Sequence, residues 1–366
     1  MKSCFAWLAN PRRLVLALAA AVAACGGGGG GAFGDDSTVP AVNVTVSGAA
    51  EFEMVPNNLG TGALDCAART WRPIRGATIE LIGPAGTPLT SSGTGSRGEY
   101  AFTVPNPNAD VFVRVRAQAL RSGATGGVWD VSVRDNSAEA LYTLDTVPFA
   151  PATTQTRSVR AASGWGGSSY TAPRSAAPFA VLDNAWSAMQ TVLGVAPSQN
   201  FPPLRIFWSI NNRPVDSTDL SSGDIGTSFY VLNNGQHQLY LLGAQNVDTD
   251  EYDRSVVVHE FGHYLQSALS RNDSPGGPHS GDEALDRRVA FSEGWGNAWA
   301  GIVSGEPRYA DSLGPQQASG FIIDVSSPPA STRGWFSEDS VQHLIWRFHE
   351  TAGIRLAPIY NLLTGP

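Results

Sequence analysis

Residues 249–271 read TDEYDRSVVVHEFGHYLQSALSR and contain the pattern H-E-x-x-H at His259, Glu260 and His263. In a helix, residues four apart lie on one face, so the two imidazoles can bind one metal ion from the same side. Glu260, one position further on, then lies beside the place of a water on that ion. Neutral imidazoles suit zinc. The stretch therefore predicts zinc-assisted hydrolysis, with His259 and His263 as ligands and Glu260 as the general base.

The residues around the pattern predict a helix. Asp248 followed three positions later by Glu251 resembles a capping box, so we expect the helix to begin there. Apolar residues recur at helical spacing on one face, at Val257, Phe261, Tyr264 and Leu265. The alternative is a purely structural helix with two core histidines, and a second feature further along the chain favours the metal site.

That second feature is a predicted helix over residues 280–305, with Ser280 and Glu283 as a capping box and Gly305 at its exit. A zinc site with two histidines needs another protein ligand. The extended pattern with a third histidine is absent, because Gln266 and Leu269 occupy the places of its glycine and its histidine.

The predicted second helix supplies a carboxylate instead. We expect Glu293 to be the third ligand and Asn297, one turn later, to support a ligand by hydrogen bonding. His279 in the connecting segment is an alternative ligand, which is less favoured because a flexible loop positions ligands poorly compared with a helix.

With these residues in place, HEFGH followed by SEGWGNA resembles the gluzincin group of zinc metallopeptidases, over roughly residues 178–305. The resemblance implies a Zn²⁺ cofactor in a zincin fold, with the ligands and general base named above, and a peptide substrate bound by strand addition at a sheet edge. The chain departs from the thermolysin-like members in a longer spacing to Glu293, and Asn297 stands where those members often have an aspartate. The family and the peptide specificity therefore stay open.

Peptidases of this class often stabilise the oxyanion with a further His or Tyr. The candidates are His343, Tyr309 and Tyr360. His343 belongs to a predicted helix over residues 337–350 that Ser337 caps, and a solvated histidine is its alternative reading. The expected core residues of this helix are Val341, Leu344, Ile345 and Phe348. Trp295 and Trp299 are expected in the core rather than in a cleft wall.

The amino-terminal residues 1–24 have the composition of a signal peptide, with basic residues ahead of an apolar run that is too short to span a membrane. Val22-Ala23-Ala24-Cys25 resembles a bacterial lipobox. This resemblance implies a lipid on Cys25 and anchoring in the cell envelope, and Gly26 favours the outer membrane. A plain secretory signal is the alternative. Residues 25–38 are rich in glycine and predict a flexible tether.

Residues 39–147 contain short alternating strands separated by Gly, Pro and Asn, which predicts a small β-sandwich. The turn at residues 96–99 and the strand with Tyr100 and Phe102 resemble the carboxypeptidase regulatory-like, transthyretin-like family. Residues 148–177 read as a linker, and residues 178–366 as the metallopeptidase-like domain. The predicted fold class is therefore α+β, with a zincin-like domain after a β-sandwich.

Composition limits the partners. The chain has 366 residues, is 42% hydrophobic and carries a net charge of −8, which argues against nucleic acid. We expect a peptide or protein substrate, with the lipid anchor as the membrane contact. One rival is a non-catalytic surface lipoprotein that binds a protein or carbohydrate on this scaffold. A second is a structural zinc site, but such sites are closed by four ligands and are rich in cysteine, unlike this one.

Overall fold

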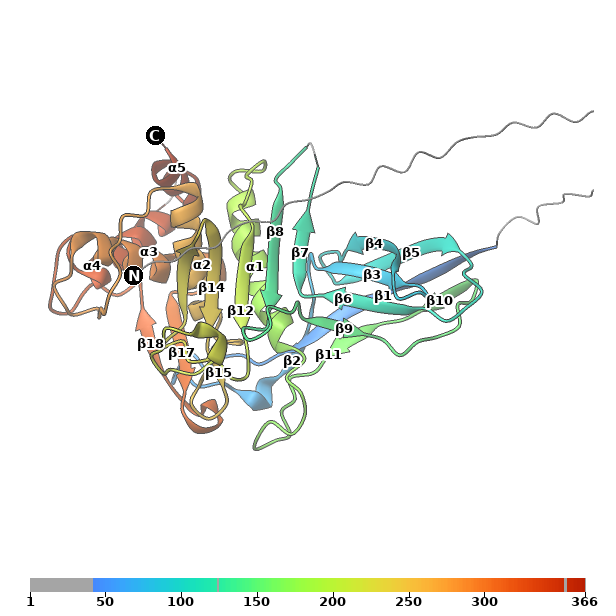
Figure 1. Cartoon of the computed structure of the whole chain (residues 1–366). Coiled ribbons are helices and arrows are strands. Elements are labelled where there is room, and N and C mark those ends of the chain that lie inside the picture. The colour runs from blue at the N-terminus through green and yellow to red at the C-terminus, as the bar shows by residue number, and fades with distance from the viewer. Residues whose placement is uncertain (1–41, 124, 352–353, 366) are drawn as a thin grey trace, which may run out of the picture. The chain divides into compact units, whose positions relative to one another are not determined.

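The computed structural model describes residues 42–123, 125–351 and 354–365, and it has an α+β fold (Figure 1). The predicted signal peptide, the tether and the lipidation site Cys25 lie outside the described residues. Among the described residues, no helix combines the length and the apolar character that crossing a membrane requires.

Two sheets form the amino-terminal part of the described chain. The first is built around β1 (Asn43–Met54) and also contains β2 (Thr70–Pro73), β5 (Glu99–Pro105), β10 (Thr154–Thr156) and β11 (Val159–Ala161). The second has the order β4 (Pro88–Gly93), β3 (Thr78–Ile82), β6 (Phe112–Arg116) and β9 (Thr143–Asp145). In β5 every second residue is buried, the alternation expected when one face of a strand covers a core.

A mixed sheet follows, with the order β13 (Phe229–Asn233), β14 (Gln236–Leu241), β12 (Leu204–Trp208), β8 (Trp129–Arg134) and β7 (Gln118–Arg121). β14, β12 and β8 run parallel, while β13 and β7 are antiparallel to their neighbours. A small antiparallel sheet contains β15 (Gly243–Ala244), β16 (Asp248–Thr249), β17 (Arg308–Leu313) and β18 (Ser319–Asp324).

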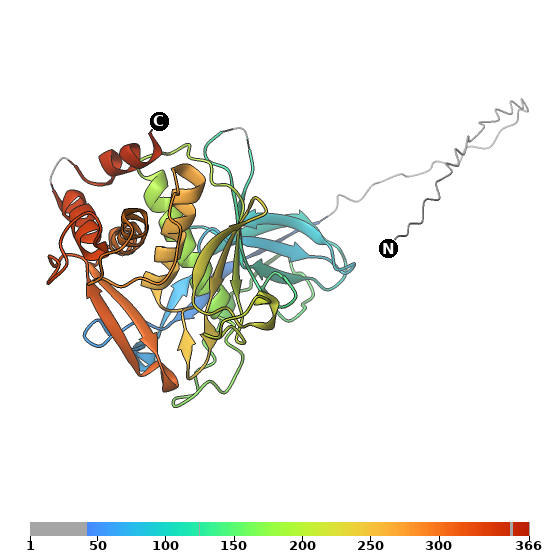
Figure 2. The same ribbon diagram turned by 60° about the vertical axis from the view of Figure 1, so that its left-hand side comes forward.

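The helices are α1 (Ala177–Leu193), α2 (Arg254–Leu269), α3 (Arg287–Ser304), α4 (Glu338–Glu350) and α5 (Leu356–Thr364). α1 contacts β8 and β7, α2 contacts β13 and β14, and the two helices contact each other, so both cover the same face of the mixed sheet. α3 packs on α2, and α4 packs on α3 (Figure 2). Trp295 and Trp299 of α3 are buried and stack on each other. Trp299 lies in the core as predicted, whereas Trp295 also lines a groove, the alternative to a core position.

The sequence predicted a β-sandwich over residues 39–147 and a separate domain from residue 178. The sheets of the structure do not follow this division. β8, which we expected inside the β-sandwich, pairs with β12, which lies after the predicted linker. The predicted linker contributes β10 and β11, which both pair with β1. Alternation of apolar residues shows that a segment is a strand, but the partner of that strand depends on long-range packing that the pattern does not contain.

Two predicted helix starts were wrong. Asp248 belongs to β16, and α2 begins six residues later, at Arg254. Likewise, α3 begins at Arg287 after the cap Asp286, whose carboxylate accepts from the backbone N–H of Arg288, so Ser280 and Glu283 lie in the preceding loop. The predicted cap Ser337 of α4 was right, because its hydroxyl accepts from the backbone N–H of Ser340.

A buried ion pair fixes the segment just ahead of α2. Arg174, in the predicted linker, lies 2.8 Å from the Glu251 carboxylate, and the two side chains are 4% and 0% exposed. Trp208 of β12 donates to the other oxygen of Glu251 at 3.2 Å. Arg174 also donates to the carbonyl of Gly243. These bonds tie the mixed sheet, the linker and the approach to α2 together.

Replacing Arg174 by methionine is expected to lower the free energy of unfolding by about 3–5 kcal/mol, because it leaves the Glu251 charge buried without its partner. Urea unfolding measures the change. The matched control is Arg160→Met, which breaks a pair with Glu51 in which the arginine is 61% exposed, and it should cost less than about 1 kcal/mol. Equal losses in the two variants would contradict this role of Arg174.

Candidate metal centre

Helix α2 presents both histidines of the H-E-x-x-H pattern on one face. The Nε2 atoms of His259 and His263 lie 3.0 Å apart. Both side chains are largely buried, with 8% and 12% of their surface exposed. The spacing of four residues produces this geometry, because it returns the chain to the same side of the helix.

Glu293 reaches the two histidines from α3. Its Oε2 atom lies 3.2 Å from the Nε2 atom of His259 and 3.2 Å from that of His263. Zinc bonds of about 2.0–2.1 Å in tetrahedral geometry place the ligand atoms about 3.3–3.4 Å apart. The triangle of two nitrogens and one carboxylate oxygen therefore has the size of one face of a zinc site.

Hydrogen bonds on the outer side of His259 determine which ring nitrogen carries the proton. Asn297 donates through Nδ2 to Glu338 Oε1 at 2.7 Å and to Gln342 Oε1 at 2.8 Å. With both amide hydrogens used, Asn297 Oδ1 accepts from the Nδ1–H of His259, 2.8 Å away. In a neutral imidazole the other nitrogen is then an acceptor, so the Nε2 lone pair of His259 points toward Glu293.

Ser292 has the same effect on His263. Its hydroxyl donates to Gln266 Oε1 at 2.9 Å, so its oxygen accepts from the Nδ1–H of His263 at 3.1 Å. Both neutral imidazoles thus direct an Nε2 lone pair at a carboxylate oxygen. Three buried acceptors facing one another are unfavourable unless a cation lies among them. The donor set of two imidazoles and one carboxylate fits zinc.

Glu260 is buried beside the ligand atoms. Ligand atoms of His259, Glu260 and His263 lie within 4.8 Å of one another. Burial raises the pKa of Glu260 to about 7, with a further contribution from the Glu293 charge, while the charge of a protonated His259 and a hydrogen bond from the backbone N–H of Tyr230 oppose the rise. A carboxylate with a pKa near neutrality is suited to accept and release a proton.

The sequence analysis missed a carboxylate that α4 brings to the centre. Glu338 is 4% exposed, accepts from Asn297 through Oε1, and lies 2.9 Å from His279 Nδ1 through Oε2. The His279 Nε2 atom lies 3.5 Å from Glu293 Oε2. The hydrogen bond to Glu338 raises the pKa of His279 to about 9. Acidic residues are common in the first turn of a helix, so Glu338 carried no functional signal in the sequence.

Two glycines of α3 make this arrangement possible. A Cβ at Gly296 would lie 2.7 Å from the imidazole of His259. A Cβ at Gly294 would lie 2.8 Å from the backbone oxygen of Glu338. Any side chain at these positions would push α2 or α4 away from α3. The glycines of the SEGWGNA segment therefore bring His259 and Glu338 to Asn297.

The three candidates for oxyanion stabilisation lie in different parts of the structure. The ring of Tyr309, in β17, packs edge-on against His259 with centroids 6.0 Å apart, and it is nine-tenths buried. His343 lines a groove to which none of His259, Glu260, His263 and Glu293 contributes. Tyr360 donates to Gln199 at 2.5 Å. Of these three residues only Tyr309 lies beside the candidate metal centre.

Comparison with known families gives one match. Residues 220–346 match the Mycolysin C-terminal domain. The matched segment is about a third of the chain, and it contains all of α2 and α3 with the three candidate ligands and Glu260. No curated protein matches the chain. Mycolysins are zinc metallopeptidases, so the match points to a peptidase family of the thermolysin type.

Proposed function

We propose that this protein is a zinc-dependent peptidase whose metal is held by His259, His263 and Glu293. The observation that carries the proposal is the inward-facing triangle of two Nε2 atoms and one carboxylate oxygen, with edges of 3.0 and 3.2 Å. Bound zinc supplies polarisation of the scissile carbonyl and a lowered pKa of water. Glu260 takes the proton from the attacking water and passes it to the nitrogen of the leaving amine. The family match to residues 220–346 supports this reading.

The substrate in this proposal is a peptide in extended conformation. Among the described strands, β13 pairs only with β14, so it is an edge strand. β13 also contacts α2, and the backbone N–H of its residue Tyr230 hydrogen-bonds Glu260. A peptide that adds to the open edge of β13 would run past the general base, with its backbone held by main-chain hydrogen bonds.

His279 is the residue that we assign to the carbonyl oxygen of the substrate. Because its pKa is raised to about 9, His279 carries a proton on both ring nitrogens at neutral pH. Glu338 accepts the Nδ1–H at 2.9 Å, and the Nε2–H lies beside the proposed ligand Glu293. The His279 side chain is 33% exposed, so it borders the centre from the solvent side. An N–H fixed in this way can stabilise negative charge as it develops on the oxygen. Glu338 acts through His279 and is a positioning residue.

Replacing His279 by glutamine is expected to lower kcat about 10²-fold, with little change in KM or zinc content. Glu338→Gln should lower kcat by a smaller factor, because a glutamine side chain cannot accept the hydrogen bonds of both His279 and Asn297 as the two carboxylate oxygens do. His343→Gln is the matched control and should leave kcat unchanged, because His343 lies in a separate groove. If His279→Gln loses its zinc, the imidazole is a metal ligand instead, the alternative that the sequence left open.

We also propose that the protein is exported and anchored in the cell envelope, at the outer membrane, through a lipid on Cys25. The lipobox-like stretch at residues 22–25 and the glycine run after it support this placement. Labelling of the intact protein with radioactive palmitate in a bacterial host tests the proposal. Incorporation that persists in Cys25→Ala would contradict it.

A further inference from the structure

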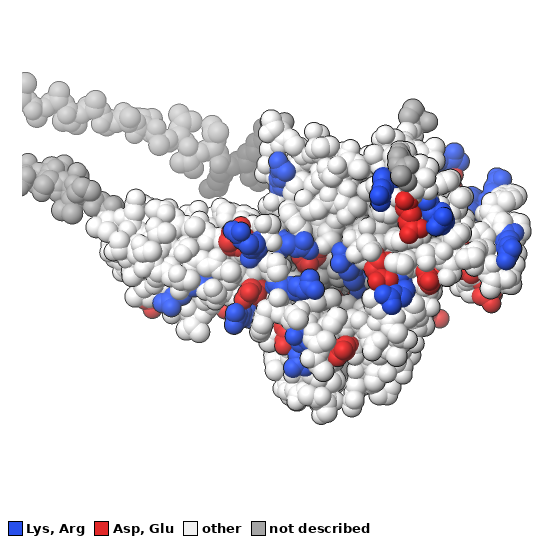
Figure 3. Space-filling model, turned by 180° about the vertical axis from the view of Figure 1, so that it is seen from behind, with Lys and Arg blue, Asp and Glu red and all other residues white. Residues whose placement is uncertain are grey.

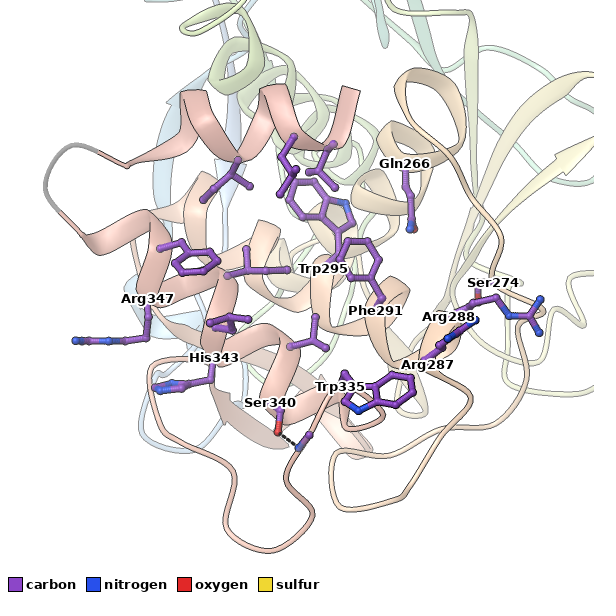
Figure 4. Close-up of a pocket in the computed structure, with 18 of the residues that line it drawn as sticks. Gln266, Ser274, Arg287, Arg288, Phe291, Trp295, Trp335, Ser340, His343 and Arg347 are labelled. Carbon is purple, nitrogen blue, oxygen red and sulfur yellow. Dashed lines mark hydrogen bonds between the residues drawn. The ribbon is translucent and has the colours of Figure 1, made fainter. Parts of the chain in front are cut away.

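A large apolar groove lies between α3, α4 and α5, and none of His259, Glu260, His263 and Glu293 lines it. Its volume is about 1070 Å³. Figure 4 shows Trp295 and Phe291 in its middle. We expected Leu344 and Phe348 in the core under α4, which was wrong: they are 52% and 41% exposed and line this groove. Trp335 and Leu362, also in the lining, are 65% and 82% exposed. Exposed apolar surface of this extent marks an interaction site.

Basic side chains surround the apolar lining. Five arginines line the groove with a single acidic residue, Asp273. They are Arg271, Arg287, Arg288, Arg333 and Arg347. Elsewhere, on the face seen in Figure 3, basic and acidic side chains lie close together, and the whole chain is acidic with a net charge of −8. Three of these arginines are ion-paired, with Asp273, Asp286 and Glu350, so the excess positive charge of the groove lies on the other two.

The arginines are arranged on both sides of the apolar lining. In Figure 4, Arg287 and Arg288 lie on one side of Phe291 and Trp295, and Arg347 lies on the other. Arg287 is over the ring of Trp335, 5.8 Å from its centroid. Within the described part of the chain, neither Arg287 nor Arg333 has a carboxylate within ion-pair distance. Arg333 Nε donates to the carbonyl of Pro329 at 3.2 Å, and the remaining N–H groups of these two side chains can bind an anionic partner.

We propose that this groove binds an amphipathic helix of a partner protein, with an apolar face bordered by Asp or Glu. The volume is at or above the upper end of the usual range for small-ligand pockets, about 300–1,000 Å³, and it can accept several large side chains. A single-chain amphiphile such as a fatty acid presents one anionic group, whereas this groove offers two guanidinium groups without a paired carboxylate among the described residues, those of Arg287 and Arg333. Helices that dock in this way place apolar anchors at positions i, i+3, i+4 and i+7.

The test is a binding titration with fluorescent helical peptides of about eighteen residues, using the full chain with Glu260→Gln so that the peptide is not cut. The first peptide has leucine and phenylalanine on one face and glutamate on both flanks. The second has lysine in place of each glutamate, and the third has the first composition in scrambled order. We expect the glutamate peptide to bind at least tenfold more tightly than either of the others, because the apolar face and the charge both contribute.

A variant of the protein with two arginines changed to glutamate tests whether their charge contributes to peptide binding. Arg287→Glu with Arg333→Glu should weaken the glutamate peptide at least tenfold and improve the lysine peptide. Both residues lie on the surface, so unchanged zinc content and circular dichroism show that the variant is folded. The proposal is overturned if all three peptides bind equally or none binds. It is also overturned if the unliganded protein self-associates through this face, or if palmitate competes with the peptide for the groove.

Discussion

Replacing Glu260 by glutamine is expected to lower the rate of peptide cleavage by about 10²–10⁴-fold while one zinc per chain stays bound. The amide cannot accept the proton of the attacking water, and the three ligand atoms on His259, His263 and Glu293 are untouched. The ligand triangle itself does not include Glu260. Cleavage is measured as the initial rate on a peptide that the parent cuts, and zinc by mass spectrometry of the purified protein.

The matched control for this substitution is Glu306→Gln. Glu306 lies after α3 and is paired with Arg308 at the surface, so its loss should leave the cleavage rate unchanged. If Glu260→Gln cleaves as fast as the parent, the general-base role is wrong. A protein that only binds a partner on this scaffold would tolerate the change, so the same comparison separates the two functions.

The second large effect is expected from Glu293→Ala, which should weaken zinc binding by more than 100-fold and abolish cleavage with it. Loss of a residue that merely supports a ligand costs about 10–100-fold in metal affinity, and Glu293 is itself a proposed ligand. Asn297→Ala should fall in that lower range, because it removes the acceptor for the Nδ1–H of His259. Competition with a coloured chelator measures the affinities.

Glu283→Ala is the control for the ligand substitution. Glu283 is an exposed glutamate in the loop before α3, and its change should leave zinc affinity and cleavage as they are. If Glu293→Ala keeps its zinc and its activity, another residue completes the site. The thermal unfolding of each variant without metal shows whether any loss reflects misfolding instead.

The metal-bearing helices could be predicted from local sequence, because the spacing that makes a zinc pattern is itself a property of the helix. His259 and His263 share a face in the structure, and Glu293 and Asn297 follow each other by one turn of α3. Helix starts were less predictable. Asp248 resembles a cap when read locally, but it pairs with Leu313 across a sheet that only the folded chain assembles.

Contacts between distant segments account for what the sequence did not reveal. Glu338 lies 41 positions beyond Asn297, its hydrogen-bond partner, and it approaches because Gly294 lets α4 pack closely on α3. The same limitation applies to β8, whose alternation was visible but whose partner β12 was not. Likewise, Leu344 and Phe348 have the helical spacing of core residues, and only the packing of α3, α4 and α5 shows that they line an open groove.

The central claim is tested most directly by exposing a mixed peptide library to the zinc-loaded protein and to its Glu260→Gln variant, and sequencing the products by mass spectrometry. We predict new peptide ends with the parent protein, with a consistent preference around the cut, and none with the variant. Absence of cleavage by a parent that holds one zinc per chain would contradict the proposal of a peptidase and leave a zinc-binding protein.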